Sequence, residues 1–359
     1  MMRKLIECVP NFSEGVNMGI IKQITDEVEA VDGVRLLNVD PGKATNRTVV
    51  TFVGEPEQVI EAAFRAIKKA GELIDMSKQK GEHPRMGATD VCPLIPIANI
   101  SMEETVEYAT KLAKRVGEGL QIPAYLYEYA QPNKSRSNLS VIRAGEYEGF
   151  FKKIKQPEWA PDFGHAENDV KRGATVIGAR DFLVAYNVNL NTTSTQLANA
   201  IAFDVRETGR SLRESDPITG KVLTDNNGKL KRIPGSLKSV KAIGWFIEEY
   251  GIAQISMNLT NIEVTPVHVA FDEVRKKAHE RGTRVTGSEL IGLIPLKAML
   301  EAGKYFLRKQ KRSVGVSESE LIKIAIKSLG LDELAPFNPH ERIIEYLLKN
   351  TADTRSFNV

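Results

Sequence analysis

Residues 34–53 read VRLLNVDPGKATNRTVVTFV, in which two apolar, β-branched stretches are joined by a polar segment that contains a Pro-Gly pair. Such stretches favour extended structure, and a Pro-Gly pair favours a turn. The pattern therefore predicts two consecutive strands, residues 34–39 and 48–53.

The neighbouring segments extend this unit on both sides. Residues 5–9 predict a short strand, and residues 20–31 predict an amphipathic helix because apolar residues recur every three or four positions. Residues 54–69 predict a second helix, since a proline and two acids occupy its first turn. The resulting order of strand, helix, strand, strand and helix is that of a split βαβ layout.

The same order recurs after residue 180, although the two halves share little residue identity. Strands are predicted at residues 182–190, 240–248, 252–259 and 284–286, and helices at 194–206 and 266–280. We therefore expect an α/β (α+β) fold with two subdomains, each built on a split βαβ-like sheet with helices on one face. The alternative is a chance alternation of helices and strands without a repeat.

The expected subdomains are residues 1–180 and 181–315, followed by a helical C-terminal tail, residues 316–359, with helices at 317–327 and 339–348. Residues 207–238 interrupt the second subdomain with a polar, glycine-containing stretch. Its length predicts either a functional loop that covers a site or a disordered segment.

Composition excludes several classes of protein. The 359 residues are 42% hydrophobic and carry a formal net charge of +3, which is too small to indicate a nucleic-acid partner. No secretory signal or membrane span is recognisable, so we expect a cytoplasmic protein with no membrane partner. Cys8 and Cys92 suit reduced, buried thiols, and the absence of clustered Cys and His ligands predicts no metal site.

The segment Lys80 to Pro93 reads KGEHPRMGATDVCP and holds one histidine in a glycine- and proline-rich loop. Pro84 restricts His83 to extended conformations, and nearby charges can tune an imidazole to exchange protons near neutral pH. His83 is therefore a candidate general acid and base. The alternative is an exposed turn with a solvated histidine.

Five runs of sequence resemble the glutamate formimidoyltransferase family. They are residues 7–15 (ECVPNFSEG), 45–49 (TNRTV), 81–93 (GEHPRMGATDVCP), 160–164 (APDFG) and 336–342 (PFNPHER). The resemblance implies transfer of the formimino group from N-formimidoyl-L-glutamate to N5 of tetrahydrofolate, giving 5-formimidoyltetrahydrofolate and L-glutamate in histidine degradation. It also implies a free-standing transferase, without the cyclodeaminase domain of the animal members. We expect a homodimer.

The resemblance assigns catalytic roles to His83, Asp40 and Arg47. His83 would take a proton from N5 and return it to the departing glutamate nitrogen. Asp40 would hold the imidazole in one tautomer, unless it is an ordinary turn residue before the Pro-Gly pair. Arg47 would bind a substrate carboxylate, unless it forms a surface ion pair.

The folate-contacting segment of the family corresponds to residues 164–173. Its members are Gly164, His165, Ala166, Glu167, Asn168, Asp169, Val170, Lys171, Arg172 and Gly173. The basic pair Lys171 and Arg172 departs from the more apolar animal version and is expected to favour the anionic tail of the folate. The implied co-substrate is tetrahydrofolate, and no metal is implied.

Two other functions remain open. An enzyme that processes 5-formyltetrahydrofolate would need ATP, and the sequence has no GxxxxGK[ST] loop. A non-catalytic folate- or RNA-binding protein is also compatible with split βαβ units. The RNA-binding form is disfavoured because an aromatic RNP-type strand is missing.

Overall fold

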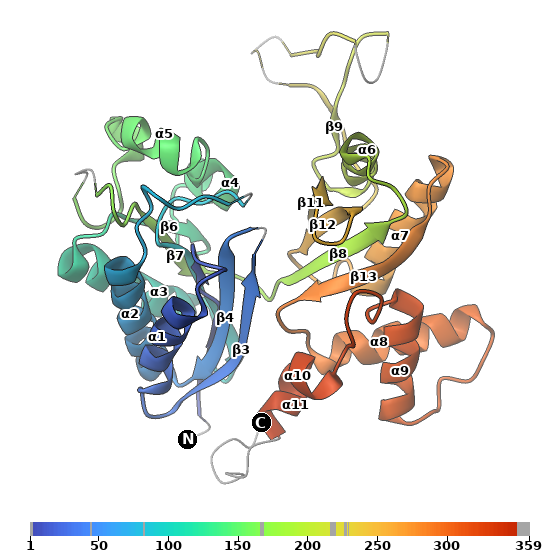
Figure 1. The fold of residues 1–359 in the computed structure, drawn as a ribbon, viewed down its shortest axis with the longest axis horizontal. Coiled ribbons are helices and arrows are strands. Elements are labelled where there is room, and N and C mark those ends of the chain that lie inside the picture. The colour runs from blue at the N-terminus through green and yellow to red at the C-terminus, as the bar shows by residue number, and fades with distance from the viewer. Residues whose placement is uncertain are drawn as a thin grey trace. The chain divides into compact units, whose positions relative to one another are not determined.

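The computed structural model describes residues 3–43, 45–81, 83–165, 169–215, 220–225, 228 and 230–349. The chain divides into two compact units, one ending at Asp181 and the other beginning at Phe182. Each unit contains its own sheet and helices, as expected for an α/β fold (Figure 1).

A single mixed sheet forms the first unit. Its strands are β1 (Leu5–Cys8), β2 (Asn11–Phe12), β3 (Val34–Gly42), β4 (Arg47–Gly54), β5 (Thr89–Ala98), β6 (Ala124–Glu128) and β7 (Thr175–Ala179). The order is β1-β4-β2-β5-β7-β6, with β3 paired to β4 and β1 also paired to β5. The pairs β5–β7 and β6–β7 are parallel and the others antiparallel.

Three long helices pack on one face of this sheet (Figure 1). They are α1 (Met18–Glu29), α2 (Pro56–Leu73) and α3 (Met102–Leu120). Successive side chains of a strand point to opposite faces of the sheet. Ile6, Phe52 and Leu94 point to the face that α1, α2 and α3 cover, and they are buried in the core there. Ser101 begins α3 with a capping box, because its side chain and that of Glu104 each accept a bond from the other's backbone N–H.

The opposite face of the same sheet is also partly covered. The remaining helices of this unit are η1 (Lys134–Arg136), α4 (Leu139–Ile142), α5 (Glu146–Lys153) and η2 (Pro157–Trp159). Ile142 and Phe150 pack against Tyr125 and Val176, which alternate with the residues that face α1 to α3. Helices on one face were expected, but in this unit they lie on both faces because β6 and β7 carry apolar residues on each side.

An antiparallel sheet in the order β11-β12-β8-β13 forms the second unit. Its strands are β8 (Val184–Leu190), β11 (Val240–Ile247), β12 (Ile252–Leu259) and β13 (Val285–Ile291), and its helices are α6 (Thr195–Val205), α7 (Val267–Glu280), α8 (Leu296–Lys309), α9 (Glu318–Leu329), α10 (Pro339–Arg342) and α11 (Ile344–Lys349). The strand predicted at residues 284–286 is therefore longer than expected. The helix predicted at 339–348 is interrupted at Ile343, which pairs with Ile294.

The helices after residue 316 bury apolar side chains in the core of the second unit. Ile322, Ala325 and Leu329 of α9 pack in the same cluster as Tyr186 and Val188 of β8. This segment, expected to form a tail, therefore contributes to that core.

Within the polar stretch at 207–238, the described residues form a narrow antiparallel ladder. It contains β9 (Arg210–Ser211) paired with β10 (Arg232–Ile233), and bridges join Arg213 to Val222 and Thr224 to Leu230. Residues 216–219, 226–227 and 229 lie outside the described part. None of the helices in the described ranges is long and apolar enough to cross a bilayer.

Candidate functional site

Three of the quoted runs converge in the first unit. The Ser13 hydroxyl donates to the carbonyl of Gly87 at 2.8 Å, which joins the first run to the third. Asn46 joins the second run to the first and to the residue before the third, because its side chain accepts from the Gly15 N–H at 2.9 Å and donates to the Lys80 carbonyl at 2.7 Å. The segments on either side of His83 are therefore held by the side chains of Ser13, which follows β2, and Asn46, which precedes β4.

The His83 ring is held at both nitrogens. Nε2 lies 2.7 Å from Nη1 of Arg47, and Nδ1 lies 2.7 Å from the Pro84 carbonyl oxygen. A guanidinium only donates and a carbonyl only accepts, so Nε2 is the acceptor and Nδ1 carries the hydrogen. This arrangement defines a neutral imidazole whose Nε2 lone pair is occupied by Arg47.

The electrostatic surroundings keep His83 neutral. Burial, followed by the positive charges of Arg47 and Arg143, lowers the pKa of His83 to about 2. Burial also lowers the pKa of Arg47 to about 10, although Asp90 and Asp40 favour its charged form. The direction of this shift is opposite to the expectation that His83 exchanges protons near neutral pH.

Asp40 lies on β3, opposite Val49 of β4. It was expected to orient the imidazole, but the two ring nitrogens are bonded to Arg47 and Pro84. The visible effect of Asp40 is on Arg47, whose positive charge it favours.

Asp90 and Arg143 are a further pair that the sequence did not single out. The Asp90 side chain is fully buried and accepts from the backbone N–H of Met86 at 3.0 Å. Arg143 binds the same carboxylate through Nε, at 3.2 Å, and through Nη2. The position of Asp90, an acid within an apolar strand, could have marked it as a candidate site residue. Arg143 follows α4 and reaches Asp90 only through the tertiary fold, so no local pattern marks it.

Part of the segment expected to contact folate lies directly against the loop after His83. The Ala88 N–H donates to the Arg172 carbonyl at 2.8 Å, and the Ala174 N–H donates to the Met86 carbonyl at 3.1 Å. Gly173 has a φ of +67°, and a Cβ there would collide with the Met86 carbonyl. Gly164, His165, Asp169, Val170, Lys171, Arg172 and Gly173 are described, whereas Ala166, Glu167 and Asn168 lie outside the described residues.

The basic pair in this segment is tied to the protein. Lys171 Nζ donates to the Glu72 carbonyl at 2.6 Å. Arg172 pairs with the Asp169 carboxylate and donates to the Leu120 carbonyl at 2.6 Å. These contacts anchor the segment, so they do not support the expectation that the pair attracts an anionic tail. His165, Val170 and Lys171 are the exposed residues in the described part.

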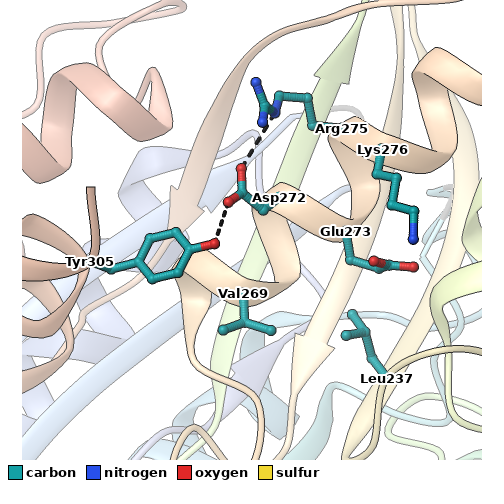
Figure 2. A pocket seen from close by; sticks show the side chains of 7 residues that line it. All are labelled: Leu237, Val269, Asp272, Glu273, Arg275, Lys276 and Tyr305. Carbon is teal, nitrogen blue, oxygen red and sulfur yellow. Dashed lines mark hydrogen bonds and ion pairs between the residues drawn. The ribbon is translucent and has the colours of Figure 1, made fainter. Parts of the chain in front are cut away.

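The second unit contains a cavity of about 410 Å³ on α7 and α8 (Figure 2). Its lining residues are Leu237, Val269, Asp272, Glu273, Arg275, Lys276 and Tyr305. Asp272 accepts from the Tyr305 hydroxyl and from Lys309 Nζ, both at 2.5 Å, and Arg275 lies 3.3 Å from its other oxygen. The acid is thus neutralised by its own neighbours, and none of the predicted site residues lines this cavity. Within the described ranges, no three His, Cys, Asp or Glu side chains cluster as metal ligands.

Comparison with known families and proteins gives consistent matches along the chain. The family described as "Formiminotransferase domain, N-terminal subdomain" matches residues 5–180, and "Formiminotransferase domain" matches residues 185–349. The formimidoyltransferase-cyclodeaminase of Gallus gallus is 49% identical over 97% of this chain and 60% of its own length. The chain therefore spans about three fifths of that relative.

Shorter relatives match over most of their own length. The glutamate formimidoyltransferase of Streptococcus pyogenes serotype M1 is 39% identical over 86% of this chain and 94% of its own. The glutamate formimidoyltransferase of Thermoplasma acidophilum is 41% identical over 85% of this chain and 92% of its own. Together with the two domain matches, these similarities place the chain in the formiminotransferase family.

Proposed function

We propose that this protein transfers the formimino group of N-formimidoyl-L-glutamate to N5 of tetrahydrofolate, releasing L-glutamate and 5-formimidoyltetrahydrofolate. The observation that carries the proposal is the convergence of three family runs on His83 and Arg47. The two glutamate formimidoyltransferases, which match over nearly their full length, support the same reaction. The reaction belongs to histidine degradation, and the proposal includes a cytoplasmic homodimer.

His83 is proposed as the group that moves protons. Attack of N5 on the formimino carbon forms one C–N bond, and the tetrahedral intermediate then breaks the bond to the glutamate nitrogen. Nε2 of His83 would take the N5 proton and return it to the leaving nitrogen. The steps need positioning and proton transfer, so we propose no metal.

Arg47 must leave the His83 lone pair before that step. A substrate carboxylate is a stronger partner for a guanidinium than a neutral imidazole, because both charges contribute to the bond. Binding a carboxylate near Arg47 and Arg143 would also offset the two charges that lower the pKa of His83. The substrate would therefore both uncover Nε2 and make it more basic.

Folate is proposed to contact residues 164–173. In support, the described part of this segment is held by backbone bonds against residues 86–88, a few positions from His83. Gly173 allows the two backbones to approach closely. Of the exposed residues His165, Val170 and Lys171, the first two would meet a ligand, because Lys171 Nζ donates to the Glu72 carbonyl.

Release of glutamate from N-formimidoyl-L-glutamate by the purified protein, measured with and without tetrahydrofolate, tests the proposal. Folate-dependent release that is lost in His83→Gln supports it. Turnover of 5-formyltetrahydrofolate with ATP, and none of formimidoylglutamate, would instead favour the formyl-processing alternative.

A further inference from the structure

Strand β5 of the first unit begins with a bulge at Asp90. Its neighbours Thr89 and Val91 pair with two residues of β2 that are adjacent in the chain. Asp90 is therefore an extra residue between these antiparallel strands, and an extra residue breaks the regular alternation of side chains. Bulges are common next to functional sites, where they redirect a side chain.

The redirected carboxylate orients the guanidinium of Arg143. Asp90 Oδ1 accepts from Arg143 Nε at 3.2 Å, and Oδ2 accepts from Nη2. Two bonds to one carboxylate fix the plane of a guanidinium. The Asp90 side chain is 1% exposed and that of Arg143 is 13% exposed, so the pair is buried at its acidic end and reachable at its basic end. Nη1 of Arg143 donates to none of the described residues and remains available to a ligand.

Arg47 projects from the same face of the sheet. Asn11 of β2 pairs with Val49 on one side and with Val91 on the other, so these three residues share one face. Val91 packs there with side chains of α4 and α5. Arg47 is two residues before Val49 in β4, so its side chain points to this face as well. Arg143 directly follows α4, which covers the same face.

The two guanidiniums act on one another and on His83. Burial and the charge of Arg143 lower the pKa of Arg47 to about 10, although two nearby carboxylates oppose the shift. After burial, Arg47 and Arg143 are the next causes of the lowered pKa of His83. Within the described ranges, Arg47 forms no ion pair, and the only side-chain hydrogen bond it makes is the contact with His83. Two like charges near one buried ring are costly, and an anion between them would lower that cost.

We infer, resting on the function proposed above, that Arg143 binds one carboxylate of N-formimidoyl-L-glutamate while Arg47 binds the other. Guanidinium and carboxylate form charge-assisted bonds, and each arginine has N–H groups left for them. The site then selects a dicarboxylate over a compound in which either carboxylate is an amide. Asp90 is a positioning residue for this selection, because it acts through Arg143.

Binding of analogues that lack the formimino group tests the inference without turnover. N-acetyl-L-glutamate keeps both carboxylates, whereas N-acetyl-L-glutamine and N-acetyl-L-isoglutamine each replace one of them by an amide of the same shape. Titration calorimetry of the purified protein measures the three affinities. We expect the dicarboxylate to bind about 10- to 100-fold more tightly than either amide, as for hydrogen bonds to a charged group. Equal affinities for all three compounds would overturn the inference.

Arg143→Gln should abolish one of the two preferences and keep the other, because it removes one of two cations. The matched control is Arg115→Gln, which changes a partly exposed arginine of α3 that pairs with Glu61 at 2.8 Å and should keep both preferences. A folded Arg143→Gln protein that keeps both preferences, or loses both, would overturn the inference.

Asp90→Asn tests the positioning role, because the amide keeps the shape but removes the charge that holds Arg143. The KM for N-formimidoyl-L-glutamate should rise about 10-fold, while kcat and the KM for tetrahydrofolate change little, which a merely structural role does not produce. If this variant does not fold, Asp90→Glu keeps the charge but moves it, and the same split is expected. Equal changes in the two KM values would overturn the role of Asp90.

The two proposals can fail separately. Folate-dependent glutamate release without any preference for the dicarboxylate would refute the two-arginine site alone. A clear preference that Arg143→Gln alters, without glutamate release, would refute the transferase function and leave the dicarboxylate site standing.

Discussion

Nη1 of Arg47 lies 2.7 Å from Nε2 of His83, so the guanidinium covers the lone pair that proton transfer needs. The contact also places a positive charge beside the imidazole and disfavours its protonation. While this contact is made, Nε2 has no free lone pair to accept a proton. Under the proposed function, a substrate carboxylate that attracts Arg47 would free Nε2, so we expect the protonation of His83 to depend on substrate.

Replacing His83 tests its role in turnover. His83→Gln and His83→Ala should lower kcat by about 100- to 10,000-fold, the range of a general acid–base group, while tetrahydrofolate binding survives. Steady-state kinetics and folate binding by calorimetry measure the two effects. His279→Gln, at an exposed position near the end of α7, is the control and should be unchanged. Near-normal turnover in a folded His83→Ala protein would exclude the mechanism.

The pH dependence of the two kinetic constants should differ. The profile of kcat/KM reports the free enzyme, in which the pKa of His83 is about 2, so no loss from His83 protonation is expected between about pH 5 and 7. The profile of kcat reports the substrate complex, in which neutralised Arg47 and Arg143 allow a higher pKa. We therefore expect an acidic limb in kcat alone. A limb near pH 6.5 in kcat/KM would contradict the proposed resting state.

The N-terminal motifs could be predicted because their signals are local. The strands at 34–39 and 48–53 follow from alternating apolar residues and a Pro-Gly turn, and the structure contains both as β3 and β4. The pairing of Arg47 with His83 was not predictable, since it depends on how the loop at residue 83 returns to β4. The family resemblance implied Asp40 as the partner of the ring, but Arg47 lies against Nε2.

The segment between β5 and Asp181 contains contacts that local sequence patterns could not predict. Strands β6 and β7 join the sheet in parallel, through contacts between residues far apart in sequence. Arg143 reaches Asp90 only because this connection returns the chain to β5. No short sequence pattern encodes such a pair.

Glu7 should make stability depend on pH. Burial raises its pKa to about 7, although Arg180 opposes the shift. Because the folded-state pKa exceeds the unfolded value, the stabilisation is complete below about pH 4.5 and is lost as the pH rises through 7. Glu7→Gln should remove this loss, about 3 kcal/mol of unfolding free energy. Urea denaturation at pH 4.5 and 8 measures it, and equal pH dependence in both proteins would contradict the assignment.

Gly173 should be required for the junction between the loop after His83 and the proposed folate segment. Gly173→Ala introduces strain at a φ of +67° and a collision with the Met86 carbonyl, whereas Gly282→Ala introduces strain at +71° with open space around it. Strain alone costs about 1 to 2 kcal/mol. We expect Gly282→Ala to lose that amount and Gly173→Ala to lose roughly 1 to 3 kcal/mol more from overpacking, together with folate affinity. Denaturation and folate titration of both variants measure the difference. Equal losses of stability and of folate affinity in the two variants would show that the close approach of Gly173 to Met86 does not matter for either property.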